Sequence, residues 1–253
     1  MRRTLTILLA MMPMLGTAGP VLEFRNDLAF KSSAVNSFAA QTYQKRISAL
    51  QADGKLDRNP ALLARLRHLI DRLKPAAAYE RPAAVALQWE IHVCSDCNEN
   101  ASAMAGGKIL VGEDFITQSN LTDDELAYLL AHEMGHVLAE HTREFATTAR
   151  YFVGMGLKRD YSDIQHEIDE SLSLMLRLEP LYKQQEMEAD YIALILGARA
   201  RFRPEAMISL LHKLDTGGKS MFDVHPGSAM RIRHAETVLP AAHRLYDLGI
   251  PAH

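Results

Sequence analysis

The chain has 253 residues, of which 48% are hydrophobic and 23% are charged. This composition is typical of a folded globular protein, and it excludes a disordered chain and a bundle of membrane-spanning helices. The formal net charge is −3 and no basic cluster is interleaved with aromatic residues, so nucleic acid is not an expected partner.

The first twenty residues differ from the rest of the chain. Two arginines near the start precede an almost unbroken apolar run over residues 5–15, and small residues follow it. This layout is typical of a secretory signal peptide, and the run is short for a transmembrane helix. We therefore expect a signal peptide over 1–18 and a single metallopeptidase domain over 19–253, located in the periplasm or secreted. An uncleaved membrane anchor is the alternative.

Two helices are predicted in the N-terminal part, residues 21–75. Apolar residues recur at helical spacing over 21–52, and polar residues fill the positions between them. Asn59 as a cap and Pro60 at the first helical position then open a second helix. We expect Pro75 to end it.

A small sheet is predicted next. Residues 86–93 alternate between apolar and polar, which indicates a strand. His92 falls on the polar phase of this strand, so a solvent-facing histidine is favoured over a metal ligand. A pair of glycines inside 101–111 predicts a hairpin arm or an edge strand.

The two cysteines of the chain, Cys94 and Cys97, lie in one short motif after the first predicted strand. In an exported protein a local disulfide is the favoured interpretation. Such a bridge closes a very small loop and would add little stability. A redox-active thiol pair is the weaker alternative, because the motif does not open a strand-to-helix unit.

The strongest helix signal begins at Thr122, which can cap a helix, with Glu125 three residues later to complete a capping box. The helix that follows carries His132, Glu133 and His136. Histidines four residues apart project from the same helix face and can bind one zinc ion together. Glu133 lies about a quarter turn away, where it can take a proton from water activated by zinc and pass it to a leaving amine. The alternative is a helix face that carries two histidines and no metal.

Residues 143–180 have a helical but highly charged pattern, which we expect Pro180 to stop. A further helix is predicted over 186–199. Glu186 and Asp190 stand one turn apart at its start, so they share a face. Glu186 can complete a site of two histidines and one glutamate, while Asp190 can orient a ligand histidine by a hydrogen bond. A solvated acidic helix start is the alternative.

The last candidate residues lie near the C-terminal helix, which is predicted from Ser228 to Val238. His225 precedes this helix and Arg231 lies six residues after the histidine. Both could stabilise the oxyanion of a tetrahedral intermediate. His225 could equally bind zinc when substrate is absent, and a loop histidine without a role stays open.

Taken together, these residues resemble the gluzincin metallopeptidases of the HtpX-like and BepA-like family, which also holds the CAAX prenyl endopeptidases. The resemblance covers roughly residues 86–240 and rests on four groups in the family's order: His132-Glu133-Met134-Gly135-His136-Val137, His141, Glu186-Met187-Glu188-Ala189-Asp190, and His225-Pro226 with Arg231. It implies an α+β fold, a mostly helical core with a small sheet beside the active-site helix. The secreted, single-domain members resemble the chain better than the integral-membrane ones.

The resemblance also implies site residues. The implied zinc ligands are His132, His136 and Glu186, with Glu133 as general base. Asp190 would support the ligands, and His225 and Arg231 would lie near the oxyanion or the metal.

We therefore expect a metalloendopeptidase with one zinc ion per chain that cuts extended or misfolded proteins of the bacterial cell envelope. Its partners would be peptide or unfolded-protein substrates and envelope or outer-membrane assembly proteins. A different class of function is a latent zinc-bearing chaperone or binding module in which His225 plugs the metal site. A metal-free helical scaffold is a second alternative.

Overall fold

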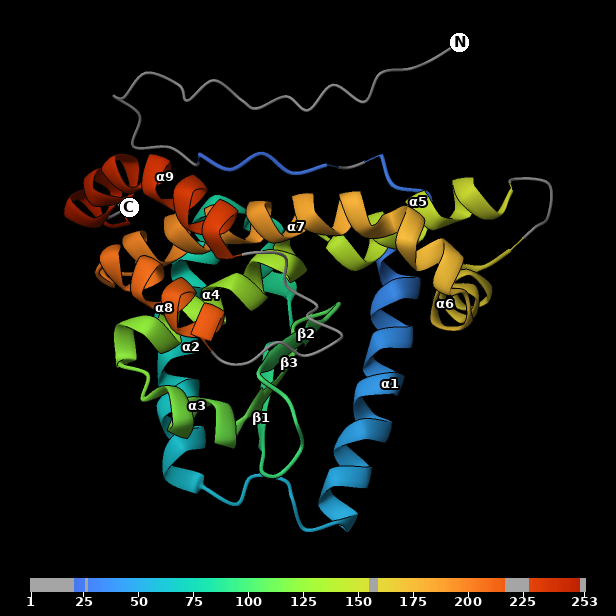
Figure 1. Cartoon of the computed structure of the whole chain (residues 1–253), viewed down its shortest axis with the longest axis horizontal. Coiled ribbons are helices and arrows are strands. Elements are labelled where there is room, and N and C mark those ends of the chain that lie inside the picture. Colours follow the sequence, from blue (N-terminus) through green and yellow to red (C-terminus); the bar gives the residue numbers. More distant parts are fainter. Residues whose placement is uncertain (1–20, 26, 155–158, 217–227, 251–253) are drawn as a thin grey trace.

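A computed structural model describes residues 21–25, 27–154, 159–216 and 228–250 (Figure 1). The expected signal peptide and His225 lie outside these ranges. The helices are α1 (Ser32–Ala52), α2 (Pro60–Glu80), α3 (Glu113–Ser119), α4 (Asp123–Leu138), α5 (His141–Val153), α6 (Tyr161–Glu170), α7 (Leu172–Arg199), α8 (Glu205–Thr216) and α9 (Ser228–Leu248), with a short 3₁₀ helix, η1, at Pro82–Ala86. The strands are β1 (Glu90–Cys94), β2 (Ala101–Met104) and β3 (Lys108–Gly112). The predicted α+β, mostly helical fold is confirmed.

The three strands form one sheet in the order β1-β3-β2, with β1 parallel and β2 antiparallel to β3. Gly106 and Gly107 form the turn between β2 and β3 with φ of 85° and 88°, a conformation that glycine adopts without strain. The predicted hairpin is therefore present. The predicted strand over 86–93 begins later, at Glu90, because η1 occupies the residues before it. The edge strand β2 packs against α4.

Two prolines were expected to end helices, and both predictions are wrong. Pro75 lies inside α2 and Pro180 lies inside α7. Proline removes one backbone hydrogen bond from a helix interior, but buried apolar residues on both sides of it can hold the helix together. In α2 these include Leu73 before the proline and Ala76 after it, both fully buried. Across the described residues, none of the helices is both long and apolar enough to cross a bilayer.

The first helix starts at Ser32 rather than near residue 21. The segment before it is fastened to the body of the protein by its backbone. The N–H groups of Val21 and Leu22 donate to Glu80 Oε2 at 2.7 and 2.9 Å, and Glu80 in turn pairs with the buried Arg199. These donors are therefore satisfied without helix formation.

Helices α4 and α7 cross closely in the middle of the main core, with α7 lying over α4 in Figure 1. A glycine lies at each point of contact. A Cβ added to Gly135 of α4 would lie 3.1 Å from the backbone oxygen of Ala189, and one added to Gly197 of α7 would lie 2.4 Å from Tyr128 Cε1. Because glycine has no side chain, the backbone of α7 can approach Gly135 and the ring of Tyr128 can pack against Gly197. The crossing brings the histidines of α4 opposite the acidic residues of α7.

Candidate metal centre

The helix that carries the two histidines is capped as the sequence predicted. Glu125 N–H donates to Thr122 Oγ1 at 3.3 Å, and Thr122 N–H donates back to Glu125 Oε2 at 2.8 Å. Glu125 also accepts from Lys213 Nζ at 2.8 Å and from Ser209 Oγ at 2.5 Å. Burial alone would raise the pKa of Glu125, but these hydrogen bonds outweigh it and lower the pKa to about 2. The start of α4 is thereby tied to α8.

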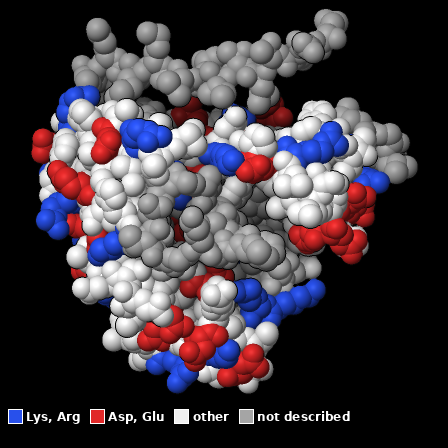
Figure 2. Space-filling model, in the orientation of Figure 1, with Lys and Arg blue, Asp and Glu red and all other residues white. Residues whose placement is uncertain are grey.

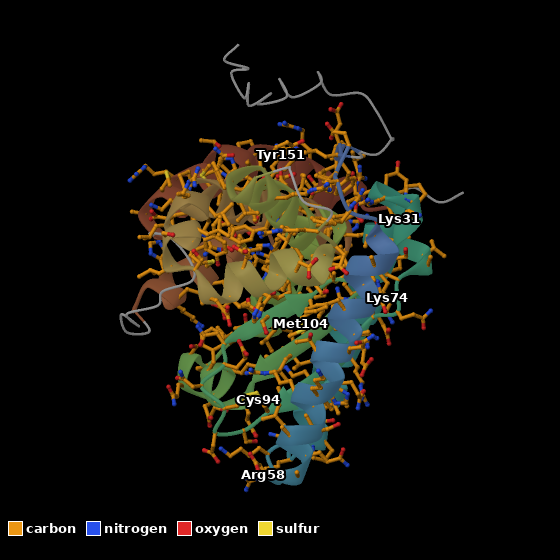
Figure 3. All side chains as sticks on the ribbon, turned by 90° about the vertical axis from the view of Figure 1, so that its right-hand side faces the viewer. Lys31, Arg58, Lys74, Cys94, Met104 and Tyr151 are labelled. Carbon is orange, nitrogen blue, oxygen red and sulfur yellow. A yellow bond between two sulfur atoms is a disulfide. The ribbon has the colours of Figure 1, made fainter. Side chains whose placement is uncertain are left out.

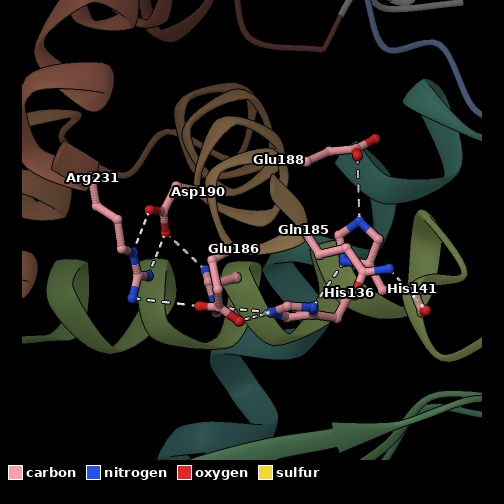
Figure 4. Close-up of polar contacts among 8 residues, drawn as sticks. His136, His141, Gln185, Glu186, Glu188, Asp190 and Arg231 are labelled. Atoms are coloured by element: carbon pink, nitrogen blue, oxygen red, sulfur yellow. Dashed lines mark hydrogen bonds and ion pairs between the residues drawn. The ribbon is translucent and has the colours of Figure 1, made fainter. Parts of the chain in front are cut away.

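One group of possible metal ligands stands out among the described residues, formed by His132, His136 and Glu186. Their ligand atoms lie within 4.8 Å of one another (Figure 4). The Nε2 atoms of the two histidines are 3.0 Å apart, and they lie 3.5 and 3.3 Å from the two carboxylate oxygens of Glu186. Two imidazole nitrogens and one carboxylate oxygen are the protein ligands of many catalytic zinc sites, so this donor set fits the ion.

Asp190 lies one turn after Glu186 on α7 and contacts the first histidine. His132 Nδ1 is 2.9 Å from Asp190 Oδ1. Arg231 holds the same carboxylate with two hydrogen bonds, from Nε at 2.7 Å and from Nη2 at 2.6 Å. Burial would raise the pKa of Asp190, but the bonds from Arg231 and His132 lower it further than burial raises it. Asp190 is therefore an ionised acceptor beside His132.

Arg231 has contacts that differ from the oxyanion role considered for it. Two of its nitrogens are committed to Asp190, and Nη1 lies 3.5 Å from Glu186 Oε2. The residue is only 4% exposed. The guanidinium thus faces the acidic residues of α7, and the geometry favours a positioning role over contact with substrate.

The second histidine contacts another histidine. His136 Nδ1 lies 2.8 Å from His141 Nδ1 at the start of α5, and His141 Nε2 lies 3.5 Å from Glu188 Oε2. Gln185 Nε2 donates to the backbone oxygen of His141 at 3.1 Å and to Glu144 Oε2 at 2.9 Å. His141 was noted only as part of the family resemblance, and no role was predicted for Gln185 or Glu188, because their partners lie over 40 residues away in the chain.

Tyr182 was also missed. It lies one turn before Glu186 on α7, and this spacing is the signal that could have revealed it. Burial raises the pKa of Tyr182, and the charge of Glu186 together with a hydrogen bond to that carboxylate raises it further. Its hydroxyl therefore stays protonated and can donate toward Glu186.

Cavities flank the histidine pair on two sides. One has a volume of only about 20 Å³ and touches His132, the buried Glu133 and Arg231, and its other walls are mostly apolar: Leu129, Met207, Leu210, Leu211 and Leu214. The other has a volume of about 260 Å³, touches His136, and runs along the edge strand past Ala103 and Met104. Of these two, only the cavity on the His136 side is large enough to hold more than a water molecule. On the face shown in Figure 2, acidic and basic side chains are mixed over the described surface.

Two sequence features lie apart from the cluster. His92 is partly buried and is not solvent-facing: its Nδ1 lies 2.6 Å from Asp57 Oδ2 within the sheet region. Cys94 and Cys97 are joined by a disulfide with a Cα–Cα distance of 5.9 Å at the end of β1. Figure 3 shows Cys94 farther than Met104 from the helical layer that carries the histidines.

Comparison with known proteins identifies the family. The family model described as peptidase family M48 matches residues 60–239, which is more than half of the chain. The chain belongs to peptidase family M48. Members of this family are zinc-dependent metallopeptidases, so the prediction of a metalloendopeptidase is confirmed at the level of the family.

Several curated relatives are similar to the M48 chain. Mitochondrial metalloendopeptidase OMA1 of Saccharomyces cerevisiae is 31% identical over 188 residues, covering 68% of this chain and 54% of the relative. The protein of the same name from Schizosaccharomyces pombe is 35% identical over 163 residues, covering 62% and 48%. Metalloprotease LoiP of Escherichia coli is 28% identical over 157 residues, covering 58% and 61%. The chain thus spans about half the length of these OMA1 relatives. The HtpX-like and BepA-like subtype stays a prediction.

The prediction of a periplasmic or secreted location is contradicted by these relatives. OMA1 of both yeasts, of Arabidopsis thaliana and of Bos taurus is named as a mitochondrial protein. Basic residues followed by an apolar run near the start of a chain are therefore not enough to assign export. The expected envelope and outer-membrane assembly partners lose their support with the location.

Proposed function

We propose that this chain is a zinc-dependent endopeptidase that hydrolyses peptide bonds in extended segments of unfolded or misfolded proteins. The observation that carries the proposal is the convergence of His132, His136 and Glu186, with Glu133 between the two histidines in sequence, at the crossing of α4 and α7. The proposed metal ligands are these two histidines and Glu186, and Glu133 is the proposed general base.

The chemistry divides between the metal and the chain. A zinc ion bound by this donor set lowers the pKa of water and polarises a carbonyl group. Glu133 accepts the proton of the attacking water and delivers it to the leaving amine nitrogen. Asp190 accepts from His132 Nδ1 and so fixes which nitrogen of this ring faces the metal. Arg231 keeps Asp190 ionised and in place.

Cleavage within a chain is supported by the names of the relatives, two of which are metalloendopeptidases. An extended segment has room in the hollow of about 260 Å³ beside His136, where the edge strand β2 contributes Ala103 and Met104 and can pair with a substrate backbone. The space beside His132 and Glu133 is about 20 Å³, which is enough for a water molecule next to the proposed base.

The competing proposal is a latent chaperone or binding module in which His225 occupies the metal position. That residue lies outside the described ranges, and the relatives are named as metalloproteases and metalloendopeptidases, which favours cleavage. Replacing His225 distinguishes the two: increased proteolysis by His225→Ala supports a plug, and loss of proteolysis supports a catalytic donor.

The base is tested with Glu133→Gln against wild type on an unfolded casein substrate. We expect proteolysis to fall by at least 100-fold, as for removal of a general base, while bound zinc stays at one ion per chain. Glu236→Gln is the control, because it makes the same replacement at an exposed glutamate of α9 outside the cluster. Equal cleavage by wild type and Glu133→Gln would refute the role of Glu133.

The metal is tested by elemental analysis. Wild type should hold about one zinc ion per chain, and His136→Ala should lose it, because one of three ligands is gone. A metal-free wild type prepared with zinc present would leave only the scaffold alternative.

A further inference from the structure

The two candidate ligand histidines are supported by different kinds of group. His132 presents its second ring nitrogen to a carboxylate, Asp190, whereas His136 presents its second ring nitrogen to another imidazole, His141 (Figure 4). We propose that His141 is a positioning residue that holds His136 in the tautomer needed to bind the metal, and that Glu188 sets the tautomer of His141. This inference rests on the proposed zinc site.

The direction of the hydrogen bonds follows from proton counting. His136 Nε2 faces His132 and Glu186, so this nitrogen must be unprotonated to bind a metal ion. The proton of neutral His136 then lies on Nδ1, which points at His141 Nδ1 at 2.8 Å. His141 Nδ1 must therefore accept, and its own proton lies on Nε2. Glu188 Oε2 lies 3.5 Å from that nitrogen, so its charge favours a proton there through an electrostatic contact rather than a formed hydrogen bond.

The contacts around His141 hold it in the orientation that these interactions with His136 and Glu188 require. The residue is 3% exposed. Its backbone oxygen is held by Gln185 of α7, and Gln185 is held by Glu144 of α5. Glu188 comes from the same helix as Gln185, two residues beyond the ligand Glu186. Helix α7 therefore supplies the proposed ligand Glu186. It also supplies Gln185 and Glu188, the two residues that orient His141 beside the other proposed ligand, His136.

A histidine that only filled space would not need these partners. Both ring nitrogens of His141 point at polar groups of the cluster rather than at the apolar core. A side chain without an acceptor at this position would leave the Nδ1–H of His136 without its partner and would release the ring to rotate. Groups that orient a metal-binding histidine in this way typically change metal affinity by about 10- to 100-fold.

The test is zinc affinity, measured by competition with a chromophoric chelator on the full chain. His141→Leu removes the acceptor and should weaken zinc binding by roughly 10- to 100-fold. His141→Gln restores an acceptor oxygen and should recover most of this loss. His68→Ala is the control, since His68 is an exposed histidine of α2, and it should leave the affinity unchanged.

A second pair of variants probes Glu188, which is 38% exposed and so tolerates replacement. Glu188→Gln keeps an acceptor oxygen and should bind zinc within about twofold of wild type, whereas Glu188→Leu has none and should bind several-fold more weakly. This pair keeps the proposal testable if His141→Leu does not fold.

Unfolding of the metal-free proteins separates positioning from general stability. If His141→Leu and Glu188→Leu lose stability without zinc but bind zinc as tightly as wild type, the inference is refuted. If wild type itself binds no zinc, the proposed function fails first. Wild-type zinc binding together with equal affinities in all variants refutes the inference alone.

Discussion

The close crossing of α4 and α7 predicts that adding one methyl group at Gly197 destabilises the protein. In Gly197→Ala the new Cβ would lie 2.4 Å from Tyr128 Cε1 and 2.7 Å from Tyr128 Cζ. Carbon atoms in contact need about 3.5–4.0 Å, so the ring or the helix must move by more than about 1 Å. Tyr128 cannot swing away freely, because it is fully buried and its hydroxyl donates to the backbone oxygen of Phe202 at 3.2 Å.

The expected magnitude is the difference between two effects. Overpacking a well-filled core by a methyl group costs about 1–3 kcal/mol. Replacing glycine by alanine inside a helix contributes about 1 kcal/mol in the opposite direction. Because the overlap is deep and the ring is held in place, we take the upper part of the first range, about 2–3 kcal/mol, and expect Gly197→Ala to lower the free energy of unfolding by about 1–2 kcal/mol. Gly135→Ala should lower it less, because the nearest atom to its Cβ would be 3.1 Å away.

Urea unfolding followed by circular dichroism measures this difference. A double-mutant cycle assigns it to the ring: in a Tyr128→Leu background, Gly197→Ala should cost at least about 1 kcal/mol less than in wild type. Gly197→Ala with unchanged or increased stability would refute the close approach of the two helices. An equal cost in both backgrounds would refute the part assigned to Tyr128.

Two further predictions concern buried glutamates. The pKa of Glu125 is lowered from 4.5 to about 2, so its ionised form contributes about 3 kcal/mol of stability, which is fully present above pH 4.5 and is lost as the pH falls through 2. The difference in unfolding free energy between wild type and Glu125→Gln should therefore shrink between pH 4.5 and pH 2. A difference that does not depend on pH would contradict this prediction. Glu80→Ala removes the carboxylate that pairs with the buried Arg199, so it should destabilise by about 3–5 kcal/mol in urea unfolding, and a loss below 1 kcal/mol would contradict this.

Local sequence signals were sufficient where the controlling contacts are local. The capping box joins residues three apart, and the two histidines are four apart on one helix, so spacing alone places them correctly. The acidic pair Glu186 and Asp190 follows the same rule on α7. These features depend on the geometry of a single helix, which the pattern of apolar residues already determines.

The sequence-based predictions were wrong where the structure depends on contacts between residues that are far apart in the chain. Whether a helix continues through Pro180 depends on what its two halves pack against, and a local pattern does not contain that information. The segment before α1 is extended because Glu80, almost 60 residues later, takes up its backbone donors. Arg231 was assigned toward substrate because its partner Asp190, 41 residues away, is not visible in the spacing around it.

The continuity of α7 past Pro180 has a consequence for the metal centre. Tyr182, Glu186 and Asp190 follow one another at intervals of four residues on one unbroken helix. One face of α7 therefore carries the proposed ligand Glu186, with a polar residue one turn before it and one turn after it. Had Pro180 ended the helix and the next one begun at residue 186, as the sequence predicted, Tyr182 would lie outside it and Glu186 in its first turn, where frayed hydrogen bonds position side chains poorly. The preceding turns, anchored by the buried Leu178, keep that turn rigid. Zinc binding therefore needs little ordering of the chain, and a change that moves α7 relative to α4, such as Gly197→Ala, should weaken zinc affinity together with stability.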